Sequence, residues 1–363
     1  MNHVQILKRA WTITWKHRAL WVLGFLLALT SGGGGGSGGG SNSNFQFGDN
    51  DNFNFGDWSQ LPAGLADLMR SIEAGLRNFF RPDNMGTVIG LVVGISILAI
   101  ALGVLFTIIR YVSETSIIRM VNRYESTEEK VSWRQGWRMG WSRAAFRLFL
   151  IDLVVYLPVV LGVIALFGCA ALPVIVGSVA AEDLSVPGLV ATIGMVLLAV
   201  FAIFALTVVL GLFMELVRRE AVLNDNGVFA SIRTGWNLMR AHLKDIFILW
   251  LIMVGIQIGV GIAGIPVFLL AVIIAVLLGG GAGVGLYFLL DAVATGAAAW
   301  GWGIGVGVGL FILLLVLIFS FLSGLFLVYR SSVWTLAYRD VTSPVRATVV
   351  PTVAPGGDVL PTA

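Results

Sequence analysis

Three segments of the sequence repeat one pattern of tryptophan and basic residues. They read RAWTITWKHRALWVLGFL from Arg9, RQGWRMGWSRAAFRLFLI from Arg134 and RTGWNLMRAHLKDIFILW from Arg233. We set one tryptophan of each segment at position zero and compare positions four and six. The three sets are Trp11, Trp15 and His17; Trp137, Trp141 and Arg143; and Trp236, Arg240 and His242. Two further basic residues, Arg18 and Lys244, follow the two histidines closely.

Such a pattern suits the surface of a membrane. Residues four apart in a helix lie on one face, so each segment predicts an aromatic and basic stripe. Tryptophan and basic residues concentrate at headgroup depth, where a nearby basic residue contributes about 1 kcal/mol to binding anionic lipid. Two interpretations stay open: the stripes only anchor the helices that follow, or they bind anionic headgroups. The candidate headgroup residues are Trp11, Trp15, His17, Arg18, Trp137, Trp141, Arg143, Trp236, Arg240, His242 and Lys244.

Residues typical of catalysis or metal binding form no recognisable pattern. The histidines, His3, His17 and His242, lack the spacing of zinc ligands. The single cysteine, Cys169, lies in an apolar run with no neighbour to stabilise a thiolate, which favours a packing role. The segment LGGGAGVG from Leu278 lacks the Lys-Ser/Thr ending of a phosphate loop and predicts a flexible turn. We expect no enzyme activity, no metal and no cofactor.

The ionisable residues of the apolar segments stand at their edges. Asp152, Glu215 and Asp245 lie near segment ends, and Gln257 is the one strongly polar residue well inside. Asp291 falls in an outer connection that predicts a re-entrant or surface helix, where an exposed carboxylate is the simpler interpretation. A proton-coupled transporter usually keeps such groups near the middle of the bilayer, so this placement disfavours that class.

Composition indicates that a lipid bilayer surrounds these elements. Of the 363 residues, 58% are hydrophobic and 12% are charged, which is too apolar for an ordinary soluble domain. Segments 87–109, 148–168, 189–214, 246–278 and 304–328 are each long enough to cross roughly 30 Å of hydrocarbon. The first candidate, 19–30, is short, and we expect residues 4–18 to continue the same helix. A cleaved signal peptide is the alternative for this region.

The distribution of basic residues predicts the topology. With both termini in the cytoplasm, all but three of the 23 basic residues lie inside, the exceptions being Arg70, Arg77 and Arg81. The predicted fold class is therefore an all-α polytopic membrane helix bundle. It has about six transmembrane helices and interfacial amphipathic helices, and it is N-in and C-in.

Four regions follow from this topology. Residues 1–30 form an N-terminal interfacial helix and the first span, and residues 31–86 form an outer-face low-complexity loop. The loop contains the tandem repeat NFQFGD and NFNFGD behind a glycine run. We interpret it as a flexible loop without a specific contact. The alternatives are an outward-facing interaction motif of paired Phe residues and a weak calcium site. Its residues 63–80 predict an amphipathic helix. Residues 87–339 form the helical membrane domain with five spans, and 340–363 a disordered cytoplasmic tail.

Glycines at every fourth position predict seams where helices pack closely. They lie in the second, fifth and sixth predicted spans, at Gly86, Gly90 and Gly94, at Gly255 and Gly259, and at Gly301, Gly305 and Gly309.

A resemblance to a known family rests on three segments: YVSETSIIRMVNRYE, VSWRQGWRMGWSRAAFRLFLIDL and REAVLNDNGVFASIRTGWNLMRAHLKDIFILWLI. Over about residues 4–30 and 107–260 the chain resembles a family of uncharacterised bacterial multi-pass membrane proteins. Its pattern is similar to the membrane domain attached to some glycerophosphodiester phosphodiesterases. The resemblance implies a bacterial plasma (inner) membrane. It carries over no catalytic residue, because no soluble stretch reaches the roughly 200 residues that a hydrolase barrel needs.

Two functions follow as expectations. The first is a non-enzymatic membrane-organising or accessory protein whose cytoplasmic tryptophan and basic belt contacts lipid headgroups. Its partners would be membrane lipids, anionic ones in particular, and membrane proteins, but no nucleic acid. The alternative is a small-molecule or lipid permease with a neutral pathway between the spans.

Overall fold

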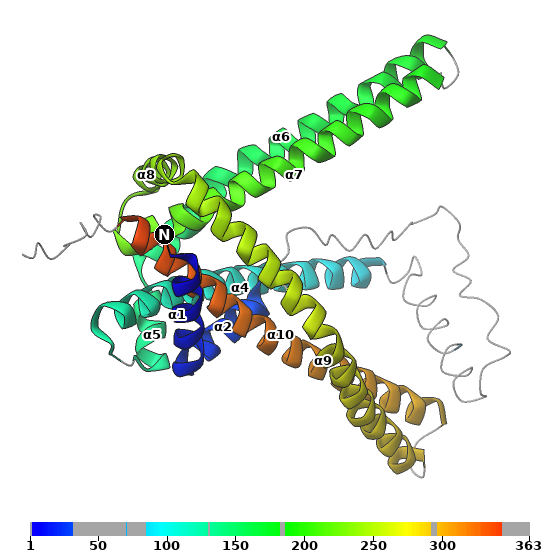
Figure 1. Ribbon diagram of the computed structural model, residues 1–363. Coiled ribbons are helices and arrows are strands. Elements are labelled where there is room, and N and C mark those ends of the chain that lie inside the picture. The colour runs from blue at the N-terminus through cyan, green and yellow to red at the C-terminus, as the bar shows by residue number, and fades with distance from the viewer. Residues whose placement is uncertain are drawn as a thin grey trace, which may run out of the picture.

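The computed structural model describes residues 2–31, 70, 85–129, 131–181, 186–291 and 296–342, and these residues form helices and no strand (Figure 1). Four helices are short: α1 (His3–Lys16), α2 (Ala19–Thr30), α5 (Trp133–Gly140) and α8 (Val228–Ala241). Five are long: α4 (Met85–Thr127), α6 (Arg143–Ala181), α7 (Val186–Leu223), α9 (Leu243–Asp291) and α10 (Gly296–Thr342). The all-helical prediction is confirmed for the described part of the chain.

The helices divide into a hub and three arms (Figure 1). The hub contains the four short helices and one end of every long helix. The arms are the apolar remainders of the long helices: α4 alone, the α6/α7 pair and the α9/α10 pair, which extend from the hub in different directions. Each of the five long helices is long and apolar enough to cross a membrane, so the chain has the elements of a multi-pass membrane protein.

The N-terminal region differs from its prediction. We expected one helix to run from residue 4 through residue 30, but α1 ends at Lys16 and α2 starts at Ala19. The 12 residues of α2 span about 18 Å, less than the roughly 30 Å of hydrocarbon. The helix packs instead on α10 and α4, with Gly24 against the backbone of Gly324. The structure therefore supports five long spans and one short apolar helix.

The hydrophobic core lies in the hub. Its largest fully buried side chain, Trp334, packs there with Ile13, Leu148 and Leu216, which come from different helices. The arms expose apolar side chains instead. In the most apolar 18-residue stretch of α4, only 6% of the residues are buried. Cys169 shares this exposure on α6, so the predicted packing role is wrong, because no core surrounds that part of the helix.

Glycine packing occurs at positions other than those predicted. Within the described part of the chain, no atom of a neighbouring helix comes within 4 Å of a Cβ placed at Gly86, Gly90, Gly94, Gly255, Gly259, Gly305 or Gly309. The observed seam joins α9 and α10, where Gly279 and Gly283 meet Gly307 and Gly303. Because α9 continues without a break to Asp291, the predicted flexible turn at LGGGAGVG is also wrong. The i+4 glycine spacing was a correct signal, but which face meets a neighbour depends on the whole bundle.

Several predictions fall outside the described residues. These are the tandem repeat of the loop, the amphipathic helix at residues 63–80, of which only Arg70 is described, and the tail after residue 342. The predicted helix between the last two spans is limited in the same way. Asp291 is the exposed last residue of α9, and α10 begins at Gly296.

Candidate functional site

Each of the three repeated segments lies where a short helix gives way to the next helix. The first joins α1 to α2, the second α5 to α6, and the third α8 to α9. The residues that cap the C-terminal ends of the short helices are His17, Trp141 and His242, whose backbone N–H groups donate to carbonyls four residues earlier at 3.1, 3.1 and 3.2 Å. The chain then turns and starts a new helix. The single helix predicted for residues 4–30 is therefore wrong, and the other two segments show the same short helix followed by a new one.

Each short helix does not continue into the helix that follows it, because it packs sideways on another, long helix. The residue before the first tryptophan, Ala10, Gly136 or Gly235, is buried in every segment. A Cβ at Gly136 would stand 2.3 Å from Met120 Sδ on α4, so a larger side chain would force the Met120 side chain or α5 to shift. Likewise, one at Gly235 would stand 2.6 Å from Val217 Cγ2 on α7. The small residue was a readable signal in the sequence, but its partner helix was not.

These contacts define three similar modules. The helix α4 enters the hub and packs on α5, and α7 enters and packs on α8. The helix α1 has no described helix before it and packs on α10, the last helix of the chain. The rings of Trp11 and Tyr329 mark this contact, with centroids 5.9 Å apart. The first and last described helices thus complete the third module.

The predicted pairs of the stripes are present at the short helices, with Trp137 half-buried against the hub core and the other tryptophans exposed. The rings of Trp11 and Trp15 lie 5.5 Å apart, and those of Trp137 and Trp141 lie 6.5 Å apart. In the third module the Arg240 guanidinium carbon stands 5.1 Å from the ring centre of Trp236, a cation–π contact. Because the opposite face of each helix is buried, the stripes are directed outward. Positions zero and four therefore meet as the sequence predicted.

The two histidines of the pattern occupy different environments. His17 is buried at 8% exposure, with its ring centre 3.9 Å from that of Tyr124 on α4. His242 is half-buried at the end of α8. The structure therefore places His17 within the hub core, away from the surface where headgroups would lie, because α1 closes onto α4 and α10 there.

Three basic residues occupy equivalent places directly after the breaks. Arg18 precedes the first residue of α2, Arg143 is the first residue of α6, and Lys244 is the second residue of α9. All three are exposed, and none of their side chains makes a hydrogen bond or ion pair with any residue that the structure describes. We call Arg18, Arg143 and Lys244 the helix-start cations.

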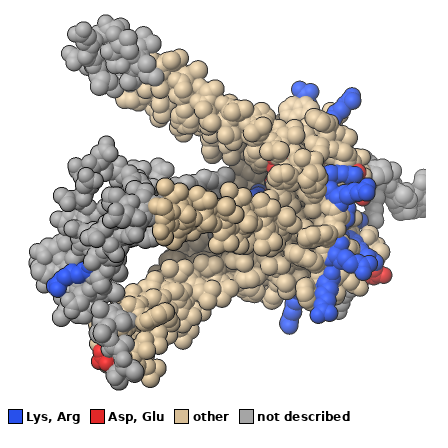
Figure 2. Space-filling model, turned by 180° about the vertical axis from the view of Figure 1, so that it is seen from behind, with Lys and Arg blue, Asp and Glu red and all other residues tan. Residues whose placement is uncertain are grey.

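Several other basic residues of the hub are engaged with acids. Arg9 Nε donates to Glu125 Oε2 at 3.0 Å, and this hydrogen bond raises the pKa of Arg9 above its usual value. Arg119 bonds the side chains of Ser142 and Asp225, both at 3.1 Å. Figure 2 shows the basic side chains gathered at the hub and the arms almost free of them. The helix-start cations are thus unpaired members of a basic surface.

A buried ionic network, which the sequence interpretation missed, ties the long helices together. Arg218 on α7 donates to Glu114 of α4 at 3.0 Å and to both carboxylate oxygens of Asp152 of α6 at 2.9 Å. Tyr111 donates to the same Asp152 carboxylate at 2.8 Å. Asp152 was visible at a segment edge, but its cation partner Arg218 is 66 residues away, and Glu114 is 104 residues from the same arginine.

A second part of the network joins α7 to α10. Glu215 accepts from Arg330 at 2.8 Å and from its neighbour Arg219, and Glu220 accepts from Tyr338. Buried charges are tolerated only when they are paired and hydrogen-bonded, so these contacts fix the places of α4, α6, α7 and α10 relative to one another. The network is therefore the structural support of the three modules.

Comparison with known proteins assigns the chain to a family. Residues 11–342 match a family of unknown function, DUF7544. The chain belongs to that family. No curated protein and no solved structure matches it. The part matched to DUF7544 begins at Trp11 of the first stripe and ends at Thr342, the last residue of α10. The ionic network, the second and third modules and all but the first part of α1 therefore lie within the family region.

Proposed function

We propose that this DUF7544 protein is a non-enzymatic, multi-pass membrane protein that organises anionic lipids at the cytoplasmic face of the membrane. The observation that carries the proposal is the triplet of helix-start cations. A cation in the first turn of a helix meets the positive end of the helix dipole, an unfavourable placement by about 0.3–1 kcal/mol. No acidic residue offsets it in the first turn of α2 or α6, although α9 has Asp245.

A bound anion would make each of these cation positions at a helix start electrostatically favourable. The backbone N–H groups at a helix start and a nearby guanidinium or ammonium together suit a phosphate. Exposed tryptophans stand beside them, with Trp15 at 50% and Trp141 at 63% exposure. The apolar arms supply the insertion into lipid that such a surface needs. Phospholipid headgroups are the anions present at that depth, so they are the ligands that we propose.

The orientation of the hub is part of the proposal. The positive-inside rule favours a cytoplasmic hub, which makes the protein N-in and C-in. In a Cys169→Ala background, we expect an outside reagent to label a cysteine at Asp291, at the end of α9, and not one at Ser126 of the hub. The opposite labelling would reverse the orientation. The resemblance to bacterial membrane proteins suggests the plasma (inner) membrane, which fractionation of the source cell would test.

The test of the lipid function is a charge-matched comparison of two triple variants. Replacing Arg18, Arg143 and Lys244 by Gln should lower retention of phosphatidylglycerol and cardiolipin by roughly fivefold per site at low salt, and less at high salt. The control replaces three other exposed basic residues of the hub, Lys8, Arg123 and Arg138, by Gln. Lipid bound per protein is measured after detergent exchange. Equal retention by the two variants would refute the proposal.

The second candidate is a small-molecule or lipid permease with a neutral pathway. The divergence of the three arms favours it, because their apolar faces are not sealed against one another (Figure 1). Solute and lipid flux into vesicles that contain the purified protein would identify this function. Flux above that of empty vesicles would favour the permease over the organising role.

A further inference from the structure

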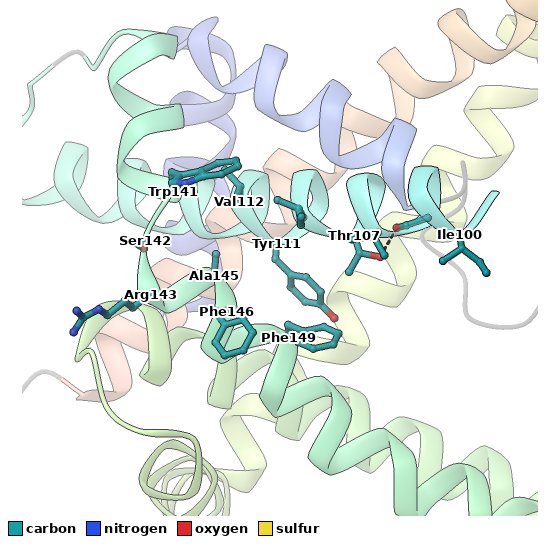
Figure 3. Close-up of a pocket in the computed structure, with 13 residues that line it drawn as sticks. Ile100, Thr107, Tyr111, Val112, Trp141, Ser142, Arg143, Ala145, Phe146 and Phe149 are labelled. Carbon is teal, nitrogen blue, oxygen red and sulfur yellow. Dashed lines mark hydrogen bonds between the residues drawn. The ribbon is translucent and has the colours of Figure 1, made fainter. Parts of the chain in front are cut away.

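A long apolar crevice lies between α4 and α6 on the hub side of the arms (Figure 3). It has a volume of about 840 Å³, within the roughly 300–1,000 Å³ typical of ligand sites. Its α4 wall runs from Ile100 to Val112, and its α6 wall includes Phe146 and Phe149. Gly103 widens the crevice, since no atom of a neighbouring element lies within 4 Å of its Cβ position.

The two ends of the crevice differ in chemistry. Ile100 and Thr107 lie at the apolar end, and Trp141, Ser142 and Arg143 lie at the hub end, with the Arg143 side chain directed away from the apolar end (Figure 3). None of the described residues that line the crevice is acidic. The crevice thus combines hydrocarbon walls with one unpaired cation at its mouth.

The Ser142 and Tyr111 hydroxyls and the Arg147 guanidinium near the mouth are already engaged, which leaves Arg143 as the available cation. Ser142 Oγ accepts from Arg119 Nη1 at 3.1 Å, and the Tyr111 hydroxyl is engaged by Asp152. Arg147, one turn along α6 from Arg143, donates to the backbone carbonyls of Asp225 and Asn226. A ligand at the mouth would therefore meet a guanidinium that has no competing partner among the described residues.

The length of the crevice matches one leaflet of a bilayer. Ile100 and Tyr111 are separated by about 16 Å along α4, at roughly 1.5 Å per residue. Half of a hydrocarbon core of roughly 30 Å is about 15 Å. A lipid acyl chain that fills the crevice would then bring its phosphate to the level of Arg143 and the exposed ring of Trp141.

We propose that the crevice between α4 and α6 is a binding site for one anionic glycerophospholipid from the hub-side leaflet. One acyl chain lies between Ile100, Phe146 and Phe149, and the phosphate contacts Arg143. This site rests on the proposed function, because Arg143 is one of the helix-start cations. It goes further by naming an acyl-chain site that Arg18 and Lys244 do not share.

Two single variants separate the acyl-chain contact from the headgroup contact. Gly103→Leu adds a side chain to the crevice at a position whose Cβ has open space, and it should remove the tightest-bound phospholipid of either headgroup. Arg143→Gln should weaken phosphatidylglycerol about fivefold and leave phosphatidylcholine unchanged. The matched control is Gly162→Leu, at a position on the α6 arm that also has open space and does not line the crevice.

The measurement is native mass spectrometry of the full chain in detergent, titrated separately with phosphatidylglycerol and phosphatidylcholine. Monodisperse elution of both glycine variants shows that they fold. If Gly103→Leu binds phosphatidylglycerol as tightly as Gly162→Leu, the crevice is not a lipid site and the proposal is overturned. Release of a co-purifying protein by Gly103→Leu would also overturn it, because a partner helix would then occupy the crevice.

A double variant, Arg18→Gln with Lys244→Gln, distinguishes this proposal from the wider function. Both residues lie outside the crevice lining. If the double variant loses phosphatidylglycerol and Gly103→Leu does not, the lipid-organising function stands and the crevice proposal fails. If only Gly103→Leu loses it, the crevice proposal stands and the three-site function fails.

Discussion

The arms of this protein expose their apolar residues, whereas the hub buries them. The arms hold the most hydrophobic segments of the chain, yet Phe201 is 72% exposed and Leu197 is 66% exposed. The hub is richer in polar residues, yet it buries Ser113, Thr115 and Arg219 together with its aliphatic side chains. Hydrophobicity alone therefore identifies the segments that face lipid, but it does not identify where the helices pack on one another.

The difference follows from the solvent of each region. In the bilayer an exposed leucine already lies in hydrocarbon, so helix contacts there depend on shape, as in the glycine seam between α9 and α10. At the hub, where charged residues gather, apolar burial and paired charges hold five long helices to one body. The arms determine that the protein enters a membrane, and the hub determines which surface it presents there.

The sharpest test of the comparison removes the cation that joins three long helices. Arg218→Gln leaves Glu114 and Asp152 without their ion-pair partner, and breaking a buried pair costs about 3–5 kcal/mol. The control is Arg123→Gln, whose pair with Glu129 is exposed and contributes at most about 1 kcal/mol. Thermal unfolding of both variants in the same detergent provides the measurement. Equal melting temperatures would mean that the network does not hold the hub.

A second test compares the same truncation in the two regions. Leu216→Ala in the hub, where the side chain is 1% exposed, should lower the free energy of unfolding by about 2–5 kcal/mol. Leu197→Ala in the α7 arm should change it by less than about 0.5 kcal/mol, because that side chain contacts lipid or detergent in the folded state. Denaturant titration in mixed micelles measures both. A large loss for Leu197→Ala would indicate that another element covers this arm.

The smallest expected effect comes from adding one methyl group. A Cβ at Gly140 would lie 1.9 Å from Ser116 Oγ and 2.3 Å from the Val112 carbonyl oxygen, so Gly140→Ala should destabilise by about 1–3 kcal/mol. Gly162→Ala on the α6 arm has open space and should be neutral or stabilising by up to about 1 kcal/mol. The two melting temperatures should therefore move in opposite directions or differ clearly. A tolerated Gly140→Ala would show that α5 is loosely packed on α4.

The sequence alone was sufficient for the properties that depend on local periodicity and composition. The five long spans appear because an uninterrupted apolar segment of more than about 17 residues has one stable environment. The contacts between Trp11 and Trp15 and between Trp236 and Arg240 follow from the 3.6-residue repeat of a helix. The membrane, the all-helical class and the outward stripes were thus predictable from residues near one another in the chain.

The tertiary structure decided everything that depends on residues far apart in the chain. The breaks after α1, α5 and α8 exist because Ala10, Gly136 and Gly235 pack on other helices, and those helices could not be identified from spacing. The pairing of Arg218 with Glu114 and Asp152 links positions 104 and 66 residues apart. Local sequence sets the conformation and the solvent of each helix, but which faces meet is chosen by the fit of all the helices together.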